Sequence, residues 1–333
     1  MGLLTSASSD VVLQAMHALA CSDLHGNILL YELLLRVASV WRVSSIFLAG
    51  DLAPPRGLRS GEKEPASELA ELQRRFFRRE FIPLFESFFH DHRLTHVYAI
   101  QGNDDCRAAE QTLREFDDAT ANFHLINDRI VELKDSRQMH AFFPNEAPLL
   151  FVAGYPFVPP GAGLLMDWVK YENRVALRPA GVDPCSDIFA MGIRTIADVG
   201  ADTIADDLHD YARYLTNAGE PHEYLPQRTI HLFHSPPYDT ALDWVPPGGK
   251  YQHLSLPEHI GSSEIRRFIE REQPYLFLCG HCHESVTLGD YSTTVGSTTC
   301  INPGSQTHID VLSLVQFDVF DPRRKKHFFI NAR

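Results

Sequence analysis

The 333-residue sequence is short of positive charge. Its 30 Lys and Arg residues are outnumbered by 43 Asp and Glu residues, and the formal net charge at pH 7 is -13. Proteins that bind nucleic acids through the phosphate backbone use clustered Lys and Arg side chains, so we expect no nucleic acid partner. A small phosphorylated substrate held by metal ions is compatible with this charge, because the ions supply positive charge of their own. The composition makes no prediction about oligomeric state.

Dense cysteine and long apolar runs are also missing. No stretch of about 18 apolar residues occurs, so we expect no membrane span. The six cysteines are scattered along the chain. This is typical of reduced thiols in a cytoplasmic protein, not of a disulfide framework. Because 44% of the residues are hydrophobic, the chain can bury a large core, and we expect a cytoplasmic globular protein.

Short apolar segments alternate with segments of helical spacing, which favours a layered α/β architecture. A helix is expected over residues 27–40, and residues 310–333 alternate like antiparallel strands. The remaining strands are expected at residues 17–23, 44–51, 95–104, 149–156, 229–237, 274–285 and 297–305.

Two longer segments interrupt this alternation. In residues 54–92, the spacing from Glu64 onward predicts an amphipathic helix that packs Phe76, Phe77 and Phe81 inward. This interpretation is preferred over a phosphate-binding patch, because the rest of the chain is acidic.

The second interruption covers residues 156–228. Its stretches 164–174 and 202–219 are both plausible helices, and the first brings Trp168 and Lys170 close together. Trp168 could simply pack into the core. We expect instead that the segment borders the functional site and helps to select the substrate, as loops on a rigid scaffold often do.

Five predicted strands deliver Asp, Asn or His side chains at or just beyond their carboxyl ends. These residues are Asp23, His25, Asp51, Asn103, Asp104, Asp105, His234, His281 and His283. Each has an ordinary structural explanation by itself; Asp23, for example, could cap the helix that follows it. Together the carboxylate, amide and imidazole groups suit two divalent transition metal ions such as Mn, Fe or Zn. Since ligands of open α/β sheets bind beyond the carboxyl ends of the strands, a metal site is expected there.

The stretch "CGHCHES" at 279–285 has a second interpretation. Cys279, Cys282 and His283 also match the C-x-x-C-H signature of covalent haem attachment. Such attachment requires export to an oxidising compartment, and the sequence shows no export signal. The metal-ligand interpretation is therefore favoured, with Cys282 in a variable position between two ligands.

The ordered motifs Asp23-Leu24-His25, Gly50-Asp51, Gly102-Asn103-Asp104, His234 and Gly280-His281-Cys282-His283 resemble those of the calcineurin-like metallophosphoesterases. The resemblance implies a layered αββα-type sandwich of two mixed β-sheets flanked by helices, with helical insertions. It also implies one domain over residues 1–333, with the insertions at about 54–92 and 156–228.

The resemblance further implies a role for each motif residue. Asp23, His25 and His283 would hold one metal ion. Asn103, His234 and His281 would hold the other, and Asp51 would bridge the two. Such a dinuclear centre hydrolyses a phosphomonoester or phosphodiester with a metal-activated hydroxide.

Asp104 departs from the family pattern. Many members have His at this position, which is placed to protonate the leaving group. An Asp carboxyl group with its ordinary pKa of about 3.9 is a poor proton donor at pH 7. This leaves open a second interpretation, a catalytically weak metal-dependent binder or sensor of a phosphorylated ligand. Asp105 is expected to support a neighbour by hydrogen bonding.

Overall fold

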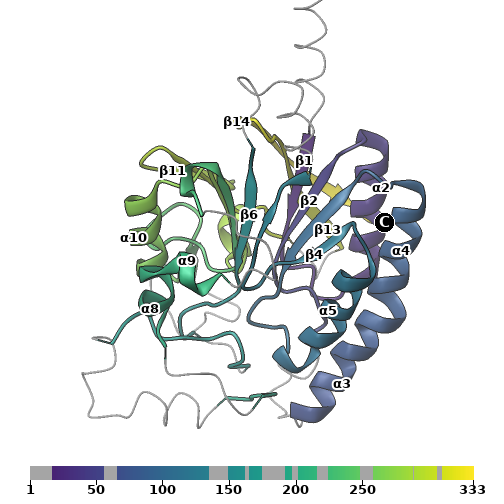
Figure 1. Ribbon diagram of the computed structural model, residues 1–333, viewed down its shortest axis with the longest axis horizontal. Helices are drawn as coiled ribbons and strands as arrows, with labels where there is room; N and C mark the ends of the chain where they lie inside the picture. Colours follow the sequence, from purple (N-terminus) through teal and green to yellow (C-terminus); the bar gives the residue numbers. More distant parts are fainter. Residues whose placement is uncertain are drawn as a thin grey trace, which may run out of the picture.

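Two six-stranded β-sheets pack against each other, and helices cover their outer faces (Figure 1). The computed structural model describes residues 17–55, 66–134, 149–161, 165–174, 192–196, 202–215, 224–247, 258–287, 289–305 and 310–333. The mixed α/β layering expected from the sequence is confirmed.

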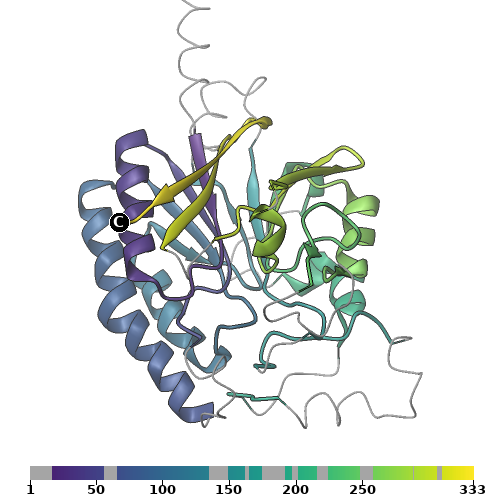
Figure 2. The same cartoon turned by 180° about the vertical axis from the view of Figure 1, so that it is seen from behind.

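The first sheet has a parallel centre and an antiparallel edge. Its strand order is β14-β13-β1-β2-β3-β4, with β1 to β4 parallel and β13 antiparallel to both of its neighbours. Seen from behind, β13 and β14 form a long hairpin beside β1 (Figure 2). The strands are β1 (His17–Cys21), β2 (Ser45–Ala49), β3 (His96–Ile100), β4 (Phe123–Leu125), β13 (Val311–Asp318) and β14 (Asp321–Asn331).

The second sheet repeats this plan with two antiparallel edges. Its order is β11-β12-β10-β7-β6-β5, in which β12, β10, β7 and β6 are parallel. The strands are β5 (Ile130–Glu132), β6 (Phe151–Tyr155), β7 (Thr229–Phe233), β10 (Leu276–Leu278), β11 (Ser292–Val295) and β12 (Thr298–Ile301).

The central strands are short and apolar because both of their faces are covered. Every residue of β2, β6 and β7 is buried, as expected for parallel strands between two layers. Between the sheets, Phe47 and Tyr98 of the first sheet belong to the same apolar cluster as Val152, Leu232 and Leu278 of the second. This shared core fixes the two sheets relative to each other.

Helices of the first half of the chain cover the outer face of the first sheet. Tyr31 of α2 (Ile28–Trp41) meets Phe81 edge to face, with ring centroids 5.2 Å apart. A π-helical turn (Phe77–Phe81) joins α3 (Ala66–Phe76) to α4 (Ile82–Asp91). Phe76, Phe77 and Phe81 are buried, so the inward packing predicted for this helix is confirmed. The helix α5 (Glu110–Ala119) completes this layer (Figure 1).

The outer face of the second sheet is covered by α8 (Ile204–His209), α9 (Tyr211–Tyr214) and α10 (Ser263–Glu272). Within residues 202–215, the described part of the helix expected over 202–219, two short helices replace it, because the backbone leaves the helical region at Asp210; residues 216–219 lie outside the described chain. A shorter helix, α11 (His283–Thr287), follows β10. Among the described residues, none of these helices has the length and apolar character needed to cross a bilayer.

The helix expected over residues 164–174 is wrong for the part that the structure describes. Leu165 and Val169 form single β-bridges with Ile193 and Val158, and a turn lies between the two bridge residues. Trp168 is buried together with both of them. The apolar residues of this stretch are therefore covered on more than one side, which a surface helix with one apolar face does not allow.

Candidate metal centre

The five predicted strand ends meet at one edge of the sandwich. β1, β2 and β3 come from the first sheet, and β7 and β10 come from the second. Among the residues that the structure describes, three groups of side chains have ligand atoms within 4.8 Å of one another and could hold a metal ion. These groups are Asp23 with His25 and His283, Asp23 with Asp51 and His234, and His25 with Asp51 and Asp104. The first is the set that the family resemblance implies for one ion.

Further ligand atoms of the predicted site residues surround the side-chain oxygen of Asn103. Asn103 Oδ1 lies 2.9 Å from His234 Nε2 and 2.6 Å from His281 Nδ1. His234 Nε2 is also 3.5 Å from Asp51 Oδ2. Amide oxygen, two imidazole nitrogens and a carboxylate thus surround one small volume. The structure brings all the residues implied for the second ion together there.

The orientation of His234 leaves one ring nitrogen for a ligand. Its Nδ1 lies 2.8 Å from the carbonyl oxygen of Ala49, to which the Nδ1–H group donates. That hydrogen bond keeps a proton on Nδ1, so Nε2 is the nitrogen that would bind an ion by giving up its own proton, as is typical of a metal-binding histidine. Nε2 is the atom that points toward Asp51 and Asn103.

Four of the expected ligands have left-handed backbones. Asp23, His25, Asp51 and His281 have φ values of 56°, 46°, 53° and 66°, and only eight non-glycine residues of the described chain have positive φ. This region costs free energy for residues with a side chain, and such strain is concentrated at functional sites. The sharp turn aims each side chain at the common centre. Sequence reasoning did not predict it for these four residues.

Glycines next to the ligands leave no room for a side chain. A Cβ atom at Gly102 would lie 2.4 Å from Asp51 Oδ1, and one at Gly50 would lie 2.4 Å from His234 Nδ1. At Gly280 it would lie 2.9 Å from Asp23 Oδ2. Gly50 also has a positive φ of 98°, but at all three positions the close contact with the ligand side chains is itself a reason for glycine.

Asp105 holds two of the ligand-bearing loops together. Its carboxylate accepts hydrogen bonds from the backbone N–H groups of Leu52 and Ala53 at 2.9 and 2.7 Å, and from Gly102 at 2.9 Å. The first two follow Asp51, and the third precedes Asn103. The predicted supporting role of Asp105 therefore has a specific form, a clamp between the β2 and β3 ends.

Asn302 does the same for the loop after β10, and sequence reasoning missed it. Its Nδ2 donates to the carbonyl oxygens of Cys282 at 2.8 Å and Gly280 at 3.3 Å. The feature that could have identified Asn302 is its position directly after β12, the strand that pairs with β10.

The buried carboxylates strongly perturb one another. Burial raises the pKa of Asp23. Burial also acts to raise the pKa of Asp51, but the attraction of His234 outweighs it and holds that pKa well below the usual range. Burial acts to lower the pKa of His234, and Asp51 outweighs it and raises the pKa to about 9. Burial, then Asp51, raises the pKa of Asp105 to about 7. The site therefore attracts positive charge.

The haem interpretation fails on accessibility. Cys279 and Cys282 are both fully buried, and Cys282 Sγ lies 3.6 Å from the carbonyl oxygen of Trp244. Neither thiol can reach a porphyrin without rearrangement of the loop.

A cavity of about 390 Å³ is lined by residues that follow β3 and β6 in the chain and by part of the 156–228 segment. Arg107 and Trp168 line it, and the Arg107 guanidinium lies 5.0 Å from the centre of the indole ring. Lys170 also lines it and pairs with Asp207 at 2.7 Å. Arg107 is four residues beyond Asn103, so one wall of the cavity belongs to the chain that follows β3.

The opposite wall continues from β6. Phe157 lines the cavity two residues beyond Tyr155, whose carbonyl oxygen accepts a hydrogen bond from the His234 N–H. Both walls thus follow, in the chain, strands that carry a predicted ligand or pair with one that does; that the 156–228 segment borders the centre stays a prediction.

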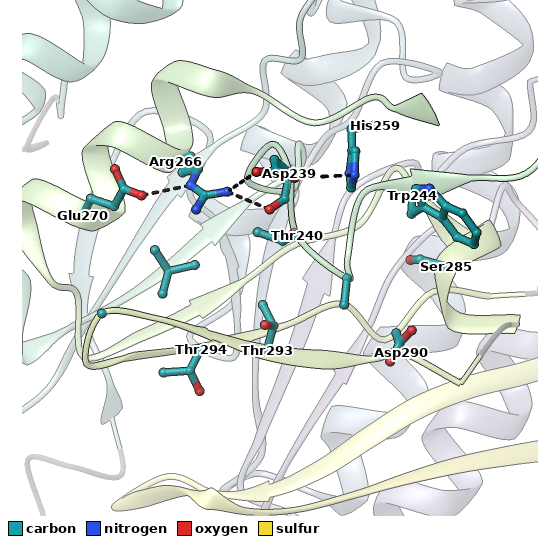
Figure 3. A pocket seen from close by; sticks show the side chains of 13 residues that line it. Asp239, Thr240, Trp244, His259, Arg266, Glu270, Ser285, Asp290, Thr293 and Thr294 are labelled. Atoms are coloured by element: carbon teal, nitrogen blue, oxygen red, sulfur yellow. Dashed lines mark hydrogen bonds and ion pairs between the residues drawn. The ribbon is translucent and has the colours of Figure 1, made fainter. Parts of the chain in front are cut away.

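A larger cavity of about 580 Å³ contains none of the predicted site residues. In it, Arg266 lies between Asp239 and Glu270, and His259 approaches Asp239 from the other side (Figure 3). Its charged groups already pair with one another, so it does not compete with the ligand cluster as the reactive site.

Comparison with solved structures supports the fold. One solved structure matches with a TM-score of 0.55 and 14% identity, covering 95% of this chain and 99% of the other. The protein TT1561 of Thermus thermophilus matches with a TM-score of 0.51 and 15% identity, covering 96% and 99%. A dimetal phosphatase from Danio rerio matches less well, with a TM-score of 0.40 and 9% identity over 96% and 99% of the two chains.

No protein-family model matches the sequence, and no curated protein is significantly similar to it. At these identities the structural matches show the fold alone. The layered fold of two mixed sheets is consistent with that of the calcineurin-like metallophosphoesterases, whose motifs the sequence resembles.

Proposed function

We propose that this protein is a metal-dependent phosphoesterase with a dinuclear centre, acting on a small phosphorylated substrate in the cytoplasm. One observation carries the proposal: carboxylate, amide and imidazole ligand atoms from both sheets converge within a few ångström, held by strained turns and close-packed glycines. Hydrogen bonds alone give no reason to bury Asp23 and Asp51 so close together.

The residues present fit two divalent ions. Asp23, His25 and His283 would hold one, and Asn103, His234 and His281 the other, with Asp51 shared. The donor set mixes oxygen and nitrogen, as Mn, Fe and Zn accept. When bound, two such ions supply Lewis-acid charge and activate water for in-line displacement at phosphorus. The protein's own part is to fix the donors, through the Asp105 clamp, the Asn302 clamp and the His234–Ala49 hydrogen bond.

We propose that the cavity lined by Arg107 and Trp168 takes the part of the substrate that does not react. Arg107 is stacked on Trp168 and about one third exposed, so its N–H groups can donate to an anionic or hydroxylated substrate. Aromatic walls next to charged groups suit a compact organic group better than a polymer. We therefore propose that Arg107 and Trp168 select among small esters.

The test is a panel of phosphomonoesters and phosphodiesters, assayed after reconstitution with Mn²⁺. We expect turnover of at least one class, and loss of turnover on chelation. Arg107→Ala should raise KM by about tenfold and change the order of substrates, because it removes binding outside the reacting group. The matched control is Arg79→Ala, an exposed arginine of the π-helical turn. An unchanged order of substrates in Arg107→Ala would contradict the role of the cavity.

Asp104 favours a second candidate function. A centre without an efficient proton donor would suit a metal-dependent binder or sensor of a phosphorylated ligand with little turnover. An activated aryl phosphodiester separates the two, since its leaving group departs without protonation. Hydrolysis of that ester favours the phosphoesterase, and tight binding without hydrolysis favours the sensor.

A further inference from the structure

Asp104 faces into the ligand cluster. Its Oδ2 lies 3.6 Å from His25 Nδ1, and its side chain is 19% exposed. Its backbone N–H donates to Asp51 Oδ1 at 2.7 Å, which ties the base of its side chain to the shared carboxylate. The carboxyl group is thus directed at two expected ligands of the same ion.

The spacing of these three residues is that of ligands around one ion. One ligand atom from each of His25, Asp51 and Asp104 can be chosen so that all three lie within 4.8 Å of one another. His25 Nε2 is 3.9 Å from Asp51 Oδ2. Because Zn–N and Zn–O bonds are about 2.0–2.2 Å long, two ligands of one such ion lie roughly 3–4.4 Å apart. Nδ1 of His25 faces Asp104 and Nε2 faces Asp51, so the test for a shared ion is the set with one atom from each residue, which stays within 4.8 Å.

A hydrogen bond orders the Asp104 carboxylate and its neighbour together. Asn103 Nδ2 donates to Asp104 Oδ1 at 3.0 Å, so the amide turns its own oxygen toward His234 and His281. With Oδ1 engaged in this bond, Oδ2 is the atom that faces His25. One oxygen of the carboxylate thus orients Asn103, and the other faces His25.

From this geometry we propose that Asp104 is an additional metal ligand, joining the ion held by His25 and Asp51. The inference rests on the proposed dinuclear centre and deepens it. It gives the replacement of His by Asp a chemical meaning: the residue at the leaving-group position ligates metal and donates no proton. An added carboxylate also makes the set richer in oxygen, which favours Mn²⁺ over softer ions.

The experiment is a titration of metal-free protein with Mn²⁺, in which the electron paramagnetic resonance signal of free Mn²⁺ counts bound ions and gives their affinities. Asp104→Asn removes the charge and keeps an oxygen that can accept the Asn103 hydrogen bond, so it separates ligation from positioning. Asp118→Asn is the matched control, because it makes the same change at an exposed residue near the end of α5.

We expect wild type and control to bind two ions, and Asp104→Asn to bind one of them at least tenfold more weakly with the other unchanged. Loss of a supporting group costs about 10–100-fold in metal affinity, so loss of a ligand should cost no less. Unchanged affinities in Asp104→Asn would overturn the inference while leaving the proposed function intact.

Two other outcomes of the titration also test the role of Asp104. A third ion in the wild type that disappears in Asp104→Asn would overturn the inference, because Asp104 would then form a separate site. If Asp104→Asn does not fold, the pair Asp104→Glu and Asp104→Gln tests the same point. Normal binding of both ions by Asp104→Glu, together with weaker binding of one ion by Asp104→Gln, would support a carboxylate ligand. Equal binding by the two variants would overturn it. Failure of the wild type to bind metal would instead refute the proposed function.

Discussion

Asn103 Oδ1 lies 2.6 Å from His281 Nδ1, although 178 residues separate them in the sequence. Asn103 follows β3 of the first sheet, and His281 follows β10 of the second. This contact, with the one to His234, closes the candidate centre across the line where the two sheets meet. The relative position of the sheets is thus a condition for the second ion to bind.

Replacing Asn103 with Ala removes the central oxygen of this group. We expect the variant to fold and to bind one Mn²⁺ per chain instead of two. Turnover should fall by at least about a hundredfold, because loss of a ligand should cost more than loss of a group that only supports a ligand. Metal analysis after equilibrium dialysis, together with the Mn²⁺ assay, checks both values. Two tightly bound ions in Asn103→Ala would show that Asn103 is not a ligand.

Gly102 gives a test that leaves every ligand in place. Its replacement by Ala puts a methyl group 2.4 Å from Asp51 Oδ1, so the carboxylate or the loop must move. We expect Gly102→Ala to weaken metal binding by about tenfold or more. Gly161→Ala is the control, since a Cβ atom at Gly161 meets nothing within 4 Å. Equal affinity of both variants for Mn²⁺ would contradict the close packing described for the centre.

The Asp104 substitution predicts a pattern across leaving groups. At saturating Mn²⁺, Asp104→Asn should lower the rates for nitrophenyl and alkyl esters by the same factor, because Asp104 donates no proton. Asp104→His should raise the alkyl rate relative to the nitrophenyl rate, because an imidazolium can protonate a poor leaving group. The measurement is a leaving-group series at pH 7. A selective loss of a hundredfold or more on alkyl esters in Asp104→Asn would identify Asp104 as the general acid.

His231 predicts how stability depends on pH away from the centre. It is fully buried in β7, with Nε2 2.8 Å from the Tyr224 hydroxyl, and burial lowers its pKa from 6.5 to about 3. Between these values the unfolded chain binds a proton that the folded chain does not. The free energy of unfolding therefore falls as the pH drops below 6.5, by about 2 kcal/mol at pH 5.

His231→Gln cannot take up this proton and can still hydrogen-bond Tyr224. We expect the loss of stability between pH 7 and pH 5 to be smaller in the variant by about 2 kcal/mol, measured by urea denaturation of metal-free protein at both pH values. The same pH dependence in both proteins would mean that His231 does not contribute it.

Much of the candidate site could be predicted from the sequence because it lies at strand ends. Asp23, Asp51 and Asn103 follow short apolar strands, and parallel strands present their carboxyl ends at one edge. Asp105 could also be assigned a supporting role, but its partners, the N–H groups of Leu52, Ala53 and Gly102, depend on how two loops meet.

Other features depend on tertiary contacts that the local pattern does not contain. Asn302 reaches the carbonyl oxygens of Cys282 and Gly280 only because β12 pairs with β10. The stretch around Trp168 has helical spacing, yet Val169 pairs with Val158 and the helix does not form. Here burial on several sides outweighs the intrinsic preference for helix.

The most direct test of the dinuclear centre is the number of metal ions that the wild-type protein binds. Metal-free protein is reconstituted with Mn²⁺, passed through a desalting column, and analysed for metal and protein, with Asp51→Asn treated in the same way. We predict two ions per chain for the wild type and fewer for Asp51→Asn, which loses the negative charge shared by both ions. One ion or none in the wild type, or two in Asp51→Asn with unchanged affinity, would contradict the account.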